Sequence, residues 1–144
     1  ALTVKFADGA DTDESSVKAI VSALDDPEIR VPALRAIRYL GPAAAAAATA
    51  VKNQLQAEDP FIRCGALLAL GAMSRDGVDG LVAGLGDPFP YNSALAAQCL
   101  QRMGQEATPA LDALEAALVA TSNPSVRRSI AEAIKEIRGT EAQP

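Results

Sequence analysis

The chain has 144 residues, the length of one ordinary domain, and 49% of them are hydrophobic, which is enough to build a core. It contains no histidine, and this excludes Ser-His-Asp and Cys-His nucleophile systems as well as imidazole metal sites. Alanine occupies 31 positions, whereas aromatic residues make up only 3% of the chain. Because alanine is the best intrinsic helix former, this composition favours an all-α fold packed with small side chains.

The acidic charge is concentrated at the amino end. The formal net charge is −5, and residues 1–28 account for all of it, since acidic and basic residues balance in the remainder. Nucleic-acid binding needs a concentrated basic stripe, which is absent, so we expect no nucleic-acid partner. The run of six alanines at Ala43–Ala48 is far shorter than the ~20 apolar residues of a membrane-spanning helix, so we expect no membrane contact either.

Residues 1–12 are predicted to form an extended lead-in or linker, residues 13–139 one repeat domain, and residues 140–144 a disordered tail. Lys5 and Asp8 interrupt the apolar stretch that a signal peptide would need, and the first residue is not methionine. We therefore expect a fragment of a longer protein, with a processed product as the alternative. The compartment stays open: cytoplasmic for a free-standing protein, periplasmic or secreted for one of the contexts below.

The acidic run from Asp8 to Glu14 precedes the first predicted helix. It could bind calcium, but it lacks the Asp-x-(Asp/Asn)-x-(Asp/Asn)-Gly order and the distant Glu of a calcium loop. A solvated helix amino terminus, where carboxylates interact favourably with the helix dipole, explains the run better. We expect no metal and no cofactor.

Apolar periodicity predicts eight helices joined by short turns. In chain order they cover residues 13–24, 27–40, 43–57, 60–73, 77–85, 90–103, 108–120 and 124–138. Pro32 falls inside the second of them and is expected to kink it. Gly139 is expected to end the last one.

Every second helix begins with a recurring proline motif. An Asp or Asn precedes Pro at Asp26, Asp59, Asp87 and Asn123, and an Arg follows at Arg30, Arg63 and Arg127. The carboxylate or amide suits an N-cap, and proline suits the first helical position, where its missing N–H costs nothing. In the third unit, Asp87-Pro88-Phe89-Pro90-Tyr91-Asn92, an insertion delays the helix and places Tyr91 near the Arg position.

Paired helices at a spacing near 33 residues predict a right-handed α-solenoid of about four helix pairs. Neighbouring pairs must cover one another's apolar stripes. Alanines at the same helical offsets would let adjacent helices approach closely: Ala33, Ala36, Ala66, Ala69, Ala96 and Ala133.

The Asp-Pro-x-(Ile/Val)-Arg start, the alanine-rich helix that follows it and the Leu-x-x-Leu helix that precedes the next motif resemble HEAT-like repeats over residues 14–138. They are similar to the alanine-rich subtype of phycobilin lyases and of many bacterial scaffold proteins. In that family the repeat arginine often pairs with the Asp of a neighbouring repeat. The resemblance therefore implies a ladder of Asp–Arg pairs, with helix capping and stacking register as its role rather than ligand binding.

A second resemblance concerns the carboxyl half of the chain. Residues 92–111 and 123–137 are similar to the helical tails that follow some bacterial sulfatase domains. This implies an accessory domain of a secreted or periplasmic hydrolase. The sulfatase active-site signature, Cys or Ser followed by x-Pro-x-Arg, does not occur in the chain, so no activity is implied for these residues.

The candidate recognition residues are Phe89, Tyr91 and Asn92, because the third unit departs from the repeat there and brings two of the five aromatic residues together. The alternative is that Phe89 covers the core between repeats, as Phe61 could in the second unit. Cys64 and Cys99 are offset along neighbouring helices by roughly 7.5 Å, which favours free thiols over a disulfide.

Together these patterns predict a non-catalytic helical-repeat scaffold that binds a protein partner or an upstream domain of the same chain. Binding would use the helices that precede each motif, where Lys18, Lys52, Asp79, Asp112 and Glu115 are expected to face solvent. The alternatives are a carboxyl-terminal domain of a sulfatase-type hydrolase and a lyase-like HEAT protein.

Overall fold

The computed structural model describes the backbone of residues 14–141 and the side chains of residues 14–139. This part of the chain forms eight α-helices and no strand. They are α1 (Glu14–Ala23), α2 (Arg30–Leu40), α3 (Ala48–Asn53), α4 (Pro60–Ala72), α5 (Val78–Gly84), α6 (Pro90–Met103), α7 (Leu111–Ala120) and α8 (Pro124–Glu141). Four 3₁₀ segments join or extend them, over Gly41–Ala47, Gln54–Gln56, Ser74–Gly77 and Gly104–Ala110. The predicted extended lead-in, the acidic run as far as Asp13 and the end of the predicted tail lie outside the described residues.

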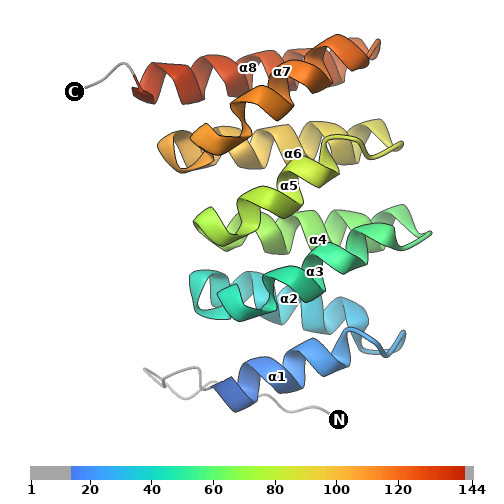
Figure 1. Ribbon diagram of the computed structural model, residues 1–144. Helices are drawn as coiled ribbons and strands as arrows, with labels where there is room; N and C mark the ends of the chain where they lie inside the picture. The colour runs from blue at the N-terminus through green and yellow to red at the C-terminus, as the bar shows by residue number, and fades with distance from the viewer. Residues whose placement is uncertain (1–13, 142–144) are drawn as a thin grey trace.

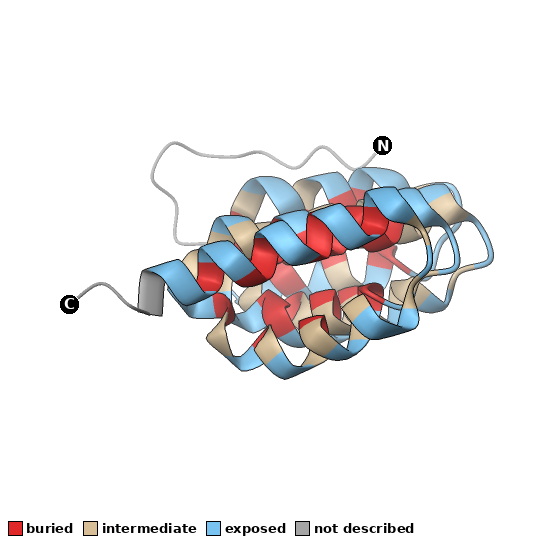
Figure 2. Ribbon diagram, turned by 90° about the horizontal axis from the view of Figure 1, so that it is seen from above, coloured by how far each residue is buried: buried red, intermediate tan, exposed pale blue. Residues whose placement is uncertain are grey.

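The helices stack in two layers (Figure 1). Helices α2, α4, α6 and α8 lie side by side in one layer, and α1, α3, α5 and α7 cross them in the other. Seen along the stack (Figure 2), the buried residues lie mainly where the two layers face each other. This is the all-α solenoid of about four helix pairs that the sequence predicts.

The predicted apolar stripes form one continuous core. Of the six alanines expected at close contacts, five are buried and Ala36 is partly exposed. Glycines add to the close packing: a Cβ on Gly84 would lie 2.3 Å from Leu67 Cδ2 and 3.3 Å from Ala96 Cβ. The small residues thus set the distance between adjacent helices.

Several predicted helix ends are wrong. The third predicted helix is an α-helix only over Ala48–Asn53, with 3₁₀ turns on both sides, and α7 begins at Leu111. Two further differences have a clear physical cause. Helix α2 begins at Arg30 rather than Pro27, so Pro32 lies in its first turn, where an amide has no intrahelical partner to lose, and it is not a mid-helix kink. Helix α8 continues through Gly139 to Glu141, because a glycine near a helix end lowers stability without forbidding the helical conformation.

The ends of the repeat helices share a backbone conformation with positive φ. Gly41 after α2 and Gly104 after α6 have φ of 57° and 55°, in a region that suits glycine. The corresponding residue after α4 is Ser74, with φ of 55°. It is the single positive-φ residue other than glycine among those described, so the second repeat keeps a strained backbone where its neighbours have none.

Candidate functional site

Each Asp or Asn of the repeat motif folds back onto the backbone two residues later. Asp59 Oδ1 accepts a hydrogen bond of 2.8 Å from the amide of Phe61, and Asn123 Oδ1 accepts from the amides of Ser125 and Val126. Both residues directly precede helices that begin with proline, as predicted. Asp26 and Asp87 make the same turn, to Glu28 and Phe89, but their helices begin three or more residues later.

The motif arginines bind the end of the preceding helix. Counted from the motif proline (Pro27, Pro60 or Pro124), the arginine is the fourth residue. Each donates to the carbonyl oxygen two residues before the motif Asp or Asn: Arg30 to Leu24, Arg63 to Ala57 and Arg127 to Thr121. We call the space that such a side chain fills the arginine slot. Its carbonyls would otherwise lack a partner, because the last carbonyls of a helix have no intrahelical donor.

Arg63 alone among the described motif arginines also pairs with the next repeat. Its Nε and Nη2 donate to Asp87 Oδ2 and Oδ1 at 2.8 and 3.1 Å, and the Asp87 side chain is only 4% exposed. Burial by itself would raise the pKa of Asp87, but hydrogen bonds from Arg63, the Phe89 amide and Asn92, with the charge of Arg63, hold it below the ordinary value. Within residues 14–139, the predicted series of Asp–Arg pairs between repeats therefore consists of this one pair.

In the third repeat Ser93 takes the place of the arginine. Counted from Pro90, which begins α6, Ser93 is the fourth residue, and its Oγ donates to Leu85 O at 2.6 Å. Leu85 again lies two residues before the motif Asp, Asp87. The prediction that Tyr91 lies near the arginine position is wrong, because the two-residue insertion moves the helix start from Pro88 to Pro90 and shifts every later residue with it.

Asn92 was predicted to be a recognition residue, but its side chain is completely buried. Its Nδ2 donates to Pro60 O at 3.1 Å and to Asp87 Oδ2 at 3.3 Å, so it joins α6 to the start of α4. Its Oδ1 accepts no hydrogen bond. Asn92 therefore has a structural position beside the Arg63–Asp87 pair, out of reach of a partner.

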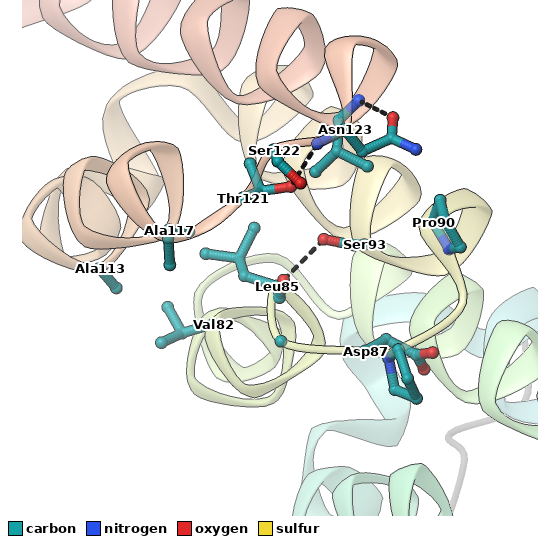
Figure 3. A pocket seen from close by; sticks show the side chains of 14 residues that line it. Val82, Leu85, Asp87, Pro90, Ser93, Ala113, Ala117, Thr121, Ser122 and Asn123 are labelled. Atoms are coloured by element: carbon teal, nitrogen blue, oxygen red, sulfur yellow. Dashed lines mark hydrogen bonds between the residues drawn. The ribbon is translucent and has the colours of Figure 1, made fainter.

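A pocket with a volume of about 550 Å³ lies where the third and fourth repeats meet (Figure 3). Leu85, Asp87 and Ser93 form one side, and Ala117 of α7 and Asn123 at the start of α8 form the other. The remaining lining is mostly small or weakly polar: Val82, Gly86, Pro88, Pro90, Ala113, Ala120, Thr121, Ser122 and Val126. In the second repeat the side chain of Arg63 fills the equivalent space, where it contacts both Ala57 O and Asp87. The pocket therefore coincides with the arginine slot of the third repeat, which no arginine fills.

The insertion also exposes its aromatic side chains. Phe89 is 45% exposed and Tyr91 63% exposed. Phe89 lies between Pro88 and Pro90, which both line the pocket. Phe61, which occupies the same place in α4 as Tyr91 in α6, is 82% exposed, so neither position covers the core between repeats.

Both cysteines are free. A Cβ on Gly71 would lie 2.8 Å from Cys99 Sγ, so Cys99 packs against Gly71 of α4. Gly71 is seven residues after Cys64, which places it about 10.5 Å further along the helix axis. Burial is the main cause that raises the pKa of both thiols above the ordinary value. Neither thiol therefore has the thiolate character of a nucleophile.

Of the five predicted solvent-facing residues on the odd-numbered helices, four form salt bridges, and Lys18 of α1 pairs with Glu14 of the same helix at 2.7 Å. Lys52 of α3 bridges to Asp79 of α5, and Glu115 of α7 bridges to Arg138 of α8. No group of three or more metal-ligating side chains occurs among the described residues. No helix in this part of the chain is both long and apolar enough to cross a membrane.

Residues 78–144, which span the third and fourth helix pairs and the pocket between them, match the family model of HEAT repeats. No curated protein sequence matches the chain significantly. HEAT repeats typically act as protein-interaction scaffolds and are generally not catalytic. The paired helices and the recurring Asp-Pro and Arg positions of the first two units follow the pattern of the matched residues, and the chain as a whole is similar to HEAT repeats.

Proposed function

We propose that this chain is a non-catalytic scaffold that binds another protein, or another domain of a longer chain, at the insertion in the third repeat. The observation that carries the proposal is the exposure of Phe89 and Tyr91 beside the pocket between the third and fourth repeats. Large aromatic side chains next to a concave surface are the usual anchors of protein interfaces. Insertions in helical repeats also place residues on one face, where partners bind.

The chemistry of the described residues supports a binding role over a catalytic one. The chain has no histidine, and the pKa values of its two thiols are raised by burial. Asp87, the most buried of the paired carboxylates, is held by Arg63 and is not available as an acid or base. A protein suits the site better than a nucleic acid, because acidic and basic residues balance from Ile29 onward.

The proposal is tested by comparing three forms of the chain as bait: the natural sequence, Phe89→Ala/Tyr91→Ala, and Val119→Ala. Val119 is 86% exposed on α7, so it controls for the loss of an exposed hydrophobic side chain elsewhere. A protein retained by the natural sequence is identified, purified and titrated against each form. We expect the double variant to bind at least about tenfold more weakly and Val119→Ala to bind normally.

Thermal unfolding of each variant shows whether the fold is intact, and exposed aromatic side chains should contribute little to it. A partner that binds the double variant as well as the natural chain would contradict the proposed contact site. Turnover of a substrate by the purified chain would contradict the non-catalytic role.

A further inference from the structure

The geometry points to a specific ligand chemistry for the pocket: we propose that it receives an arginine side chain of the partner protein. This inference rests on the proposed interaction function and adds to it the identity of the group that is bound. Its basis is the comparison of one position across four repeats of the same chain. Three repeats fill the slot with their own guanidinium, and the third repeat leaves it open.

The filled slots show which contacts a guanidinium makes there. Arg63 Nη1 donates to Ala57 O at 2.9 Å and to Glu58 O at 2.8 Å. Arg127 Nη1 donates to Thr121 O at 3.0 Å and also to Leu118 O. The acceptors are main-chain carbonyls at the end of a helix, which carry partial negative charge.

The third repeat keeps these acceptors. By position, Leu85 and Gly86 correspond to Ala57 and Glu58, and both line the pocket. Leu85 O accepts one hydrogen bond, from Ser93, and a carbonyl oxygen has two lone pairs. Gly86 O accepts no hydrogen bond from the described residues, and Gly86 is exposed to solvent.

A carboxylate is not required in the slot. Arg30 and Arg127 are held by carbonyl oxygens without an ion pair among the described side chains. In the second repeat the charged Arg63 pairs with Asp87, whereas in the third the neutral Ser93 occupies the position of Arg63 and the neutral Asn123 that of Asp87, and both line the pocket. Because the Asp87 position is an asparagine in the third repeat, the slot contains no buried carboxylate that lacks a partner. The slot is therefore neutral and keeps its main-chain carbonyl acceptors.

A guanidinium fits this arrangement better than an ammonium. Its N–H groups form a planar fork that reaches several carbonyls at once, as Arg63 does with Ala57, Glu58 and Asp87. A lysine would present a compact, strongly hydrated charge to the same oxygens. The adjacent Phe89 offers an aromatic face of the kind on which guanidinium groups stack.

The inference is tested without the unknown partner by titrating the ¹⁵N-labelled chain with N-acetyl-L-arginine amide and recording amide shifts. N-acetyl-L-citrulline amide, a neutral isostere, and N-acetyl-L-lysine amide are titrated in parallel. We expect saturable shifts centred on Leu85, Gly86, Ser93 and Thr121, with a dissociation constant of about 1 mM for a single side chain. Citrulline and lysine amides should bind at least about tenfold more weakly.

Two substitutions locate the binding site. Ala117→Leu adds a side chain to the pocket wall and should abolish the shifts. Ala116→Leu makes the same change at the neighbouring, solvent-exposed position of α7, outside the pocket, and should leave them intact. Ser93→Arg, which restores the repeat arginine, should also abolish binding by filling the slot from within.

Equal binding of citrulline amide, shifts that map elsewhere, or no shift at saturating arginine amide would each overturn the inference. So would binding that survives Ala117→Leu in a folded variant. These outcomes are independent of the partner assay. If a partner depends on Phe89 and Tyr91 but arginine amide does not bind, the proposed scaffold function stands and the inference that the pocket binds arginine is rejected.

Discussion

The hydroxyl of Ser93 and the carbonyl oxygen of Leu85 form a 2.6 Å hydrogen bond at the point where other repeats place an arginine. The second repeat makes the equivalent contact from Arg63 to Ala57. The same main-chain acceptor is thus used in every repeat, whereas the donor changes. Replacement of the long donor by a short one leaves the pocket between the third and fourth repeats.

The Arg63–Asp87 pair is expected to stabilise the stack measurably. Asp87→Asn removes a charge-assisted, bidentate contact from a side chain that is 4% exposed, so the free energy of unfolding should fall by about 2 kcal/mol. Asp79→Asn is the matched control, because the Asp79 side chain is 83% exposed and its pair with Lys52 should contribute less than about 1 kcal/mol. Urea unfolding of both variants measures the difference; equal losses would contradict the account.

The Asp87 contribution should also depend on pH in a defined direction. The folded state lowers the pKa of Asp87, so its stabilisation is complete above the ordinary value of 3.8 and is lost as the pH falls through the lower folded value. The stability difference between the natural chain and Asp87→Asn should therefore be constant from pH 7 to pH 5 and shrink below about pH 3.8. A difference that already shrinks above pH 5 would assign the effect to another group.

Ser74→Gly should stabilise the chain. Ser74 has a φ of 55°, a conformation that Gly41 and Gly104 adopt at the same place in other repeats. Relief of this strain should raise the free energy of unfolding by about 1 kcal/mol, less the entropy that glycine gains in the unfolded state. Gly104→Ser is the reciprocal variant and should destabilise. Thermal unfolding decides the sign, and a Ser74→Gly variant that melts earlier would show that the hydroxyl makes a larger contribution than the strain.

The two thiols should differ in reactivity. Cys99 is 2% exposed, Cys64 is partly exposed, and burial raises the pKa of both above 9.0. At pH 8 the modification of Cys99 by Ellman's reagent should be slower than in the unfolded chain by more than about a hundredfold, because it requires local opening. Cys64 should react at an intermediate rate. Fast modification of Cys99, or an intact mass that shows a disulfide, would contradict the packing of α6 on α4.

Much of the fold could be predicted because helix periodicity and the proline motif are local signals. Pro60 and Pro124 begin helices behind Asp59 and Asn123, as predicted, since capping depends only on neighbouring residues. The start of α2 could not be predicted from Asp26-Pro27 alone. Pro32 has no N–H to donate back along the chain, so the regular helix begins only at Arg30.

The site was predicted less well, because it depends on register between repeats. Counting from Asp87 placed Tyr91 at the arginine position, whereas counting from Pro90 places Ser93 there, and only the second count matches the structure. The burial of Asn92 was missed because its contacts, Pro60 O and Asp87, come from other segments. The run Ala43–Ala48 had no assigned role in the sequence, yet Ala44 and Ala47 are buried against the core.

The central claim is that the pocket is the third repeat's unfilled arginine slot. The most direct test is a double-mutant cycle that restores the second repeat's pair in the third, with Ser93→Arg, Asn123→Asp and both together. If the two side chains meet as Arg63 and Asp87 do, urea unfolding should show a favourable coupling energy of at least about 1 kcal/mol between them. Effects that simply add, to within about 0.5 kcal/mol, would show that the side chains do not meet and would contradict the account.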